Sequence, residues 1–109
     1  MYKEGVIMKF IIEKERIYLN NDQGEMIAEA RIPFIQTGVF NVERVFVDSS
    51  LRGQGMASKV MDEVYNYAKN NNYTVVNSCP YAVAWFKKNT DKQDVLNNEI
   101  EVNEACKLV

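Results

Sequence analysis

A loop with two glycines, between residues 48 and 58, offers the clearest chemistry in this chain of 109 residues. Its sequence is Asp-Ser-Ser-Leu-Arg-Gly-Gln-Gly-Met-Ala-Ser, and the apolar spacing that follows it predicts a helix. The first amides of a helix have no partner within the helix, and its dipole favours an anion there. Gly53 and Gly55 leave the main chain uncovered, and Arg52 adds a guanidinium that suits phosphate oxygens. These features predict a seat for a phosphate or pyrophosphate. The alternative is that the glycines serve turn geometry alone.

This loop matches neither of the two common nucleotide-binding loops. A P-loop requires GxxxxGK[ST], and no such lysine follows Gly55. The dinucleotide motif GxGxxG requires a third glycine where Ser58 stands.

Cys79 is a second candidate for chemistry. It follows a short predicted strand, residues 73–77, and precedes a helix that Pro80 opens. Ligands often bind at the carboxyl edge of parallel strands, and a thiol at a helix N-terminus can have a lowered pKa. One hypothesis is that Cys79 accepts an acyl group or acts as an acid. The other is that it is a small core residue.

Glu43 and Tyr81 are further candidates for catalysis. Glu43 shares a face with Val45 in a predicted strand over residues 39–48, which would turn its carboxylate toward the interior. A carboxylate is costly there unless it has a use, so Glu43 is a candidate general base; a surface salt bridge with Arg31 or Arg44 is the alternative. The Tyr81 hydroxyl could donate a hydrogen bond to a thiol, or its ring could cap the core.

Composition excludes several classes of function. Apolar residues make up 47% and charged residues 26%, as in an ordinary single domain, and the net charge of −2 gives non-specific nucleic-acid binding no basis. No apolar run reaches the ~20 residues of a membrane span. The sequence has no histidine, and Cys79 and Cys106 form no CxxC motif, so we expect neither imidazole catalysis nor a metal site. Reduced cysteines and a cytoplasmic location are the expectation, although a disulfide remains open.

The pattern predicts a compact α/β (α+β) fold with a mixed, mostly antiparallel sheet and two main helices. Expected strands lie near residues 9–20, 26–34, 39–48 and 73–77, with turns at 20–24 and 36–38. The contiguous run Val45-Phe46-Val47 suggests a central strand buried on both faces, parallel to residues 73–77. Expected helices begin near Ala57 and at Pro80. Residues 1–8 are expected to be a short leader, with Met8 as an alternative start, and residues 90–109 an uncertain tail.

The run Arg52-Gly53-Gln54-Gly55-Met56-Ala57 resembles the [Q/R]xxGx[G/A] element of the GNAT acetyltransferase superfamily. The similarity extends from about residue 40 to 96, and Cys79-Pro80-Tyr81 is similar to a motif of small single-domain GNAT-like proteins. The resemblance implies acetyl-CoA or coenzyme A as cofactor, with an amine, on a small molecule or a protein, as acceptor. It also implies cofactor-binding residues: Val45, Phe46, Val47, Arg52, Gly53, Gln54, Gly55, Met56, Ala57 and Ser58.

The chain departs from the superfamily at two places. Phe86 stands where a tyrosine commonly protonates the departing thiolate, and phenylalanine has no proton to donate. Arg44-Val45 replaces a histidine-threonine pair found in small relatives. Two functions follow: an N-acetyltransferase, using Cys79 for transfer, or a coenzyme A-binding module without turnover. The exposed Lys87-Lys88 end of the second helix could meet the 3′-phosphate. The sequence predicts no particular oligomeric state.

Overall fold

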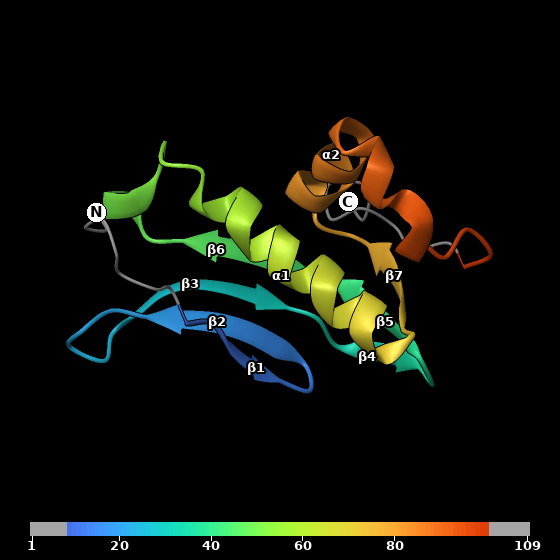
Figure 1. The fold of residues 1–109 in the computed structure, drawn as a ribbon, viewed down its shortest axis with the longest axis horizontal. Coiled ribbons are helices and arrows are strands. Elements are labelled where there is room, and N and C mark those ends of the chain that lie inside the picture. The colour runs from blue at the N-terminus through green and yellow to red at the C-terminus, as the bar shows by residue number, and fades with distance from the viewer. Residues whose placement is uncertain (1–8, 101–109) are drawn as a thin grey trace, which may run out of the picture.

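The computed structural model describes residues 9–100, which form two sheets and two α-helices (Figure 1). The expected leader, residues 1–8, and Cys106 lie outside the described residues. No helix of the described part is long and apolar enough to cross a membrane.

The first sheet has four antiparallel strands in the order β1-β2-β3-β6. They are β1 (Ile11–Glu13), β2 (Arg16–Asn20), β3 (Met26–Arg31) and β6 (Arg44–Val47). The predicted turn between β2 and β3 is confirmed: Gly24 has φ +80°, and the side-chain oxygen of Asn21 accepts the N–H groups of Gln23 and Glu25, both at 2.9 Å. A positive φ is why this turn needs glycine.

The second sheet has three strands in the order β4-β5-β7: β4 (Phe34–Gln36), β5 (Val39–Val42) and β7 (Thr74–Asn77). β7 pairs with β5 in parallel, from Val39 opposite Thr74 to Val42 opposite Asn77. The expected parallel pairing is therefore confirmed.

Two α-helices complete the fold, α1 (Met56–Asn71) and α2 (Pro80–Lys88), with 3-10 turns η1 (Ser49–Leu51) and η2 (Thr90–Val95). In Figure 1, α1 runs across one face of the first sheet. The apolar stripe that α1 buries there repeats at helical spacing: Met56, Val60, Met61, Val64 and Ala68. The helix ends within the run of asparagines, where Asn72 takes the left-handed conformation at φ +58° that closes helices.

One prediction about the strands was wrong. Residues 39–48 do not form one central strand; they form β5, inside the second sheet, and β6, at the edge of the first. Val45, Phe46 and Val47 are half-buried, not buried on both faces. Three consecutive apolar residues cannot distinguish a buried central strand from a strand that changes partners.

The described part of the tail docks on the core. Val95, at the end of η2, is buried, and Leu96 forms a parallel bridge with Val75 of β7. The α+β class with mixed, mostly antiparallel sheets is confirmed.

Candidate functional site

The loop before α1 is shaped by its two glycines. Gly53 has φ +82°, and Gly55, the N-cap residue of α1, has φ +76°. Both angles lie in the left-handed region, where a side chain costs about 1–2 kcal/mol. A Cβ added at either glycine would meet no atom within 4 Å, so both face open space. Backbone geometry and access to a ligand therefore both account for glycine here.

The amides of this loop form a row of donors. Within residues 9–100, no protein group accepts the N–H of any residue from Gly53 to Ser58; the first helical bond outward is from Lys59 N–H to the Gly55 carbonyl, at 3.2 Å. A helix leaves its first few amides unpaired, and here the preceding turn adds more. Consecutive amides at a helix start suit a diphosphate, which presents several oxygens along a line.

Side chains around the loop hold its shape. Gln54 Nε2 donates to the Ser50 carbonyl at 3.2 Å, and Asp48 Oδ2 accepts the Ser50 N–H at 3.0 Å. The Ser50 hydrogen bonds hold the pKa of the Asp48 carboxyl below its usual range, with a smaller effect of Arg52. Arg52 is exposed, donates from Nε to the Val47 carbonyl at 3.4 Å, and forms no ion pair with a described carboxylate. Its charge is available to an anion in the loop.

A fork opens where β5 becomes β6. Arg44 pairs with Arg31, and Glu43 also donates its N–H to the Arg31 carbonyl, at 2.9 Å, so an extra residue bulges at Glu43. Beyond this bulge the run leaves β7 and pairs only with β3 among the described strands.

The edge of β6 that faces away from β3 carries main-chain groups that pair with no described strand, and of these the Val47 carbonyl accepts only from Arg52 Nε. Antiparallel pairs alternate, and Asp48 N–H donates to Ile27 at 2.8 Å, so the register turns the main chain of Phe46 toward β3. The main chains of Val45 and Val47 face the fork. Of the three strand residues expected to bind the cofactor, Val45 and Val47 therefore present their main chains to the fork, and Phe46 does not.

The closed end of the fork is held by a reciprocal side-chain pair. Asn41 Nδ2 donates to Ser78 Oγ, and Ser78 N–H donates to Asn41 Oδ1, both at 2.9 Å. The next amide, that of Cys79, donates to the Val42 carbonyl at 3.0 Å. Asn41 was not singled out from the sequence; its place opposite a strand end becomes visible only once β5 and β7 pair.

The structure places Cys79 at the start of α2 beside this fork. The thiol is 7% exposed, belongs to the main core cluster, and is a free cysteine. Tyr81, the second residue of α2, is 40% exposed. Burial, followed by the charges of Asp62 and Cys79, raises the pKa of the Tyr81 hydroxyl. Tyr81 therefore stays protonated at neutral pH and can donate a hydrogen bond.

Asp62 of α1 is a neighbour of this cluster that sequence reasoning missed. The helices α1 and α2 contact each other, and Trp85 Nε1 donates to Ser58 Oγ at 2.9 Å. Asp62 lies one turn beyond Ser58, and its charge contributes, after burial, to the raised pKa of Tyr81. The sequence position of Asp62 does not by itself indicate a functional role, because its place near Tyr81 depends on the contact between α1 and α2.

Glu43 does not lie where the sequence predicted. Its side chain is 52% exposed and pairs with Arg31, Nε to Oε2 at 3.7 Å. The bulge breaks the alternation that would have turned Glu43 inward with Val45. The surface salt bridge, held open as the alternative, is the geometry observed. Phe86 is buried against Trp85, with ring centroids 5.0 Å apart, and Lys87 and Lys88 are exposed.

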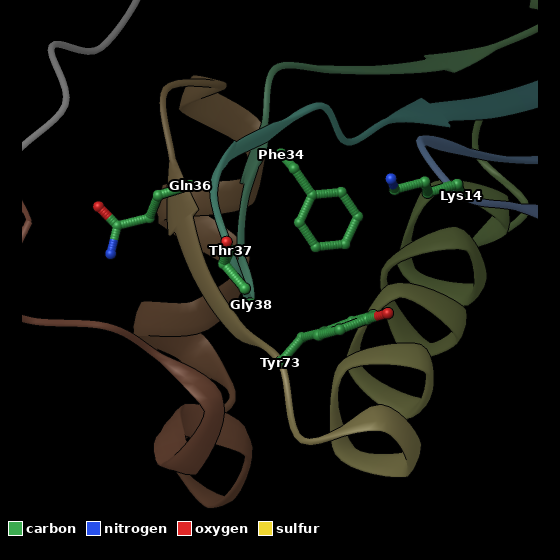
Figure 2. A pocket seen from close by; sticks show the side chains of 6 residues that line it. All are labelled: Lys14, Phe34, Gln36, Thr37, Gly38 and Tyr73. Carbon is green, nitrogen blue, oxygen red and sulfur yellow. The ribbon is translucent and has the colours of Figure 1, made fainter.

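Figure 2 shows a pocket of about 340 Å³ whose lining includes neither the loop before α1 nor Cys79. Its lining comes from the β1–β2 turn, β4, the β4–β5 turn and the residue before β7: Lys14, Phe34, Gln36, Thr37, Gly38 and Tyr73. Tyr73 lies two residues after the end of α1, whereas the loop precedes its start, so the length of the helix separates the two.

The comparisons with known proteins identify the class. Residues 16–95 match the family model of the GCN5-related N-acetyl-transferases, which is most of the chain. The fold is similar to the solution structure of a GCN5-like protein from Staphylococcus aureus, with a TM-score of 0.69 and 24% identity, over 90% of this chain and 95% of that one.

Two structures from Escherichia coli share the fold more distantly. A GNAT family N-acetyltransferase in complex with CoA gives a TM-score of 0.51 and 22% identity, over 57% of this chain and 38% of that one. The ribosomal-protein-S18-alanine N-acetyltransferase gives 0.55 and 14%, over 72% and 50%. The chain thus spans half or less of either enzyme.

The chain belongs to the GCN5-related N-acetyltransferase family, because the family model covers residues 16–95. Its class is that of enzymes that take an acetyl group from acetyl-CoA to an amine. The row of amides from Gly53 to Ser58 fits the diphosphate of that cofactor.

Proposed function

We propose that this protein transfers an acetyl group from acetyl-CoA to an amine, with the diphosphate bound by the loop before α1. The observation that carries the proposal is the run of six consecutive amides, Gly53 to Ser58, without an acceptor in the described part of the chain. Arg52 beside them forms no ion pair with a described residue. A row of donors with an adjacent guanidinium is suited to an extended anion.

The acyl arm of the cofactor would lie in the fork between β6 and β7. Bound acetyl-CoA supplies an activated thioester. The free edge of β6 offers the main-chain groups of Val45 and Val47, and an N–H there can stabilise charge on the thioester oxygen. The bulge at Glu43 and the Asn41–Ser78 pair fix the fork before any ligand arrives, so its geometry costs little on binding.

We assign the transfer itself to Cys79, the first residue of the Cys-Pro-Tyr run that resembles the motif of small GNAT-like proteins. The Cys79 sulfur attacks the thioester carbonyl, a new sulfur–carbonyl bond forms, and coenzyme A leaves with the thiol proton. The acceptor amine then attacks acetyl-Cys79, the amide bond forms, and the Cys79 thiol is restored by the amine proton. Tyr81, held in its protonated form, donates a hydrogen bond to the departing sulfur. A reducing location such as the cytoplasm would keep the Cys79 thiol available for this transfer.

Intact-mass measurement after incubation with acetyl-CoA tests both levels of this proposal. We expect an acetyl adduct on the wild type with release of about one equivalent of coenzyme A, loss of both in Cys79→Ala, and continued release of coenzyme A once an amine panel is added. Tyr81→Phe is the matched variant, and we expect it to slow adduct formation, and the coenzyme A release that accompanies it, about 10- to 100-fold. Turnover that persists in Cys79→Ala would show direct attack by the amine and remove Cys79 from the chemistry.

One observation favours a second candidate function, a coenzyme A-binding module without turnover. Phe86 replaces the tyrosine of other superfamily members and is buried against Trp85, so it could not reach a thiolate even if it had a proton. Binding of acetyl-CoA without an adduct, and without coenzyme A release across the amine panel, would favour this module.

A further inference from the structure

Asn77, the last residue of β7, carries a polar atom without a partner. Its side-chain carbonyl oxygen is shielded from solvent, and no group of the described residues donates to it; it is the single such buried side-chain atom in residues 9–100. A buried polar group that loses its partner typically costs about 1–3 kcal/mol, and folded proteins keep few of them. An unpaired asparagine at position 77 therefore does not stabilise the fold, and its presence needs another explanation.

The position of Asn77 connects it with the fork. It pairs with Val42, the last residue that β5 shares with β7, so it lies where the two strands part. Strand alternation puts its side chain on the same face as Val75, the face that packs toward α1. Ser78 and Cys79, which follow it, are both tied to the Val42 carbonyl. The other polar side chains at this end of the fork, those of Asn41 and Ser78, are already hydrogen-bonded to each other's residue.

The Nδ2 group of Asn77 likewise donates to no described residue. Neither half of the amide is therefore used by the described part of the chain, and a ligand that reaches the enclosed oxygen must displace the atoms that cover it. A thioester, which only accepts, or an ammonium, which only donates, satisfies one half of an amide, whereas another amide can satisfy both.

We propose that the side-chain amide of Asn77 binds an amide of the pantetheine arm of coenzyme A and positions that arm in the fork. This inference rests on the proposed function, because it places the arm between β6 and β7. Asn77 is a positioning residue on this view: it fixes the depth of the arm, and thereby the thioester relative to Cys79, without taking part in the transfer.

Two ligands and two variants test the inference by calorimetric titration and thermal unfolding. The ligands are coenzyme A and 3′-phospho-ADP, its nucleotide part without the pantetheine arm. For Asn77→Leu we expect coenzyme A to bind roughly five- to tenfold more weakly and 3′-phospho-ADP to bind as in the wild type, since one hydrogen-bonded contact is lost. We also expect an unchanged or higher Tm, because an apolar side chain of similar size removes an unpaired polar group.

Asn97→Leu is the matched control, since Asn97 follows η2 and hydrogen-bonds to the same strand, β7. Its amide is paired, donating from Nδ2 to Thr74 Oγ1 at 3.1 Å, so its loss should lower the Tm and leave both affinities unchanged.

The inference fails if Asn77→Leu weakens both ligands equally, if it leaves coenzyme A affinity unchanged, or if it lowers the Tm as Asn97→Leu does. Failure of both Asn77→Leu and Asn77→Ala to fold would likewise overturn it, since the amide would then be structural. Wild-type protein that binds neither ligand would refute the proposed function itself, whereas normal binding with an indifferent Asn77 refutes only this inference.

Discussion

The two ends of α1 differ in how their main-chain groups are used. At the start, the amides from Gly53 to Ser58 have no acceptor among residues 9–100. At the end, the Asn72 N–H donates to the carbonyls of Ala68 and Lys69, Tyr73 N–H donates to Ala68 at 2.9 Å, and Asn71 Nδ2 donates to Tyr67 at 2.9 Å. One helix thus has a start whose amides lack an acceptor in the described part of the chain and an end closed by its own chain.

The side chains at the two ends repeat this difference. The closed end packs four aromatic rings in mutual contact, those of Phe34, Phe40, Tyr67 and Tyr73, with ring centroids 4.9 to 6.3 Å apart. The open end has glycines, an exposed arginine and no aromatic ring in the loop. Packing stabilises the fold at one end, and unpaired donors are kept at the other. Substitutions should therefore affect stability at the closed end and ligand binding at the open end.

The largest expected effect is that of Gly55→Glu on binding. The carboxylate would stand in the row of donors meant for the diphosphate, so we expect no measurable coenzyme A binding by calorimetric titration. The positive φ of Gly55 adds a loss of stability of about 1–2 kcal/mol.

Gly24→Glu is the matched control for this variant. Gly24 has the same conformation, at φ +80°, and open space around it, but it lies in the β2–β3 turn. It should lose similar stability and keep full affinity. Retained affinity in Gly55→Glu would move the ligand site away from the start of α1.

At the closed end, Asn72→Ala should lower the free energy of unfolding by about 1 kcal/mol, because alanine is strained at φ +58°. Urea unfolding measures this loss, and Asn72→Gly should show none, since glycine adopts the same angle freely. Coenzyme A affinity of the folded protein should not change in either variant. An affinity loss in Asn72→Ala would contradict the separation of the two ends.

Arg52→Ala should weaken coenzyme A binding about three- to tenfold at low salt, and less at high salt, because an exposed charge contact is screened. Titration at two ionic strengths gives the comparison. Arg31→Ala is the control: Arg31 is exposed but paired with Glu43, and its loss should not alter binding. A salt-independent loss in Arg52→Ala would mean that Arg52 shapes the loop through the Val47 carbonyl instead.

The smallest effect concerns the tie between the closed end and η2. Lys69 Nζ and the Tyr65 hydroxyl both donate to Asp94, at 2.6 and 2.9 Å, and they lower the pKa of the Asp94 carboxyl. A lowered folded-state pKa stabilises the protein above the ordinary value, near 4, and this contribution is lost as the pH falls through the lowered value.

Asp94→Asn should therefore have a slightly lower Tm than the wild type at pH 7, and the difference should shrink as the pH falls below the ordinary aspartate value and through the lowered pKa of Asp94. Lys69→Met, which removes the partner, should show the same pH dependence. A difference that persists at low pH would mean that the Asp94 charge is not its cause.

Much of the fold followed from local signals in the sequence. The turn at Asn21 and Gly24, the stripe from Val60 to Ala68, the stop at Asn72 and the helix opened by Pro80 all depend on neighbours within a few residues. Local rules of spacing and capping are therefore sufficient to predict them. The donor-rich loop of Gly53 and Gly55 was equally predictable from the sequence, because every helix begins with unpaired amides.

The edge position of β6 and the exposure of Glu43 depend instead on a choice between partners. Residues 39–42 pair with β7, and residues 44–47 pair with β3, with the bulge at Glu43 between them. No local pattern specifies that change, since either half could have continued along the same neighbour. The amino-acid sequence by itself determined the turns, the helices and the donor-rich loop. Only the tertiary structure decided the fork, because a fork exists only when one run of chain hydrogen-bonds to two segments far apart in sequence. Asn41, Asp62 and Asn77 acquire neighbours, or lack them, through those long-range pairings alone.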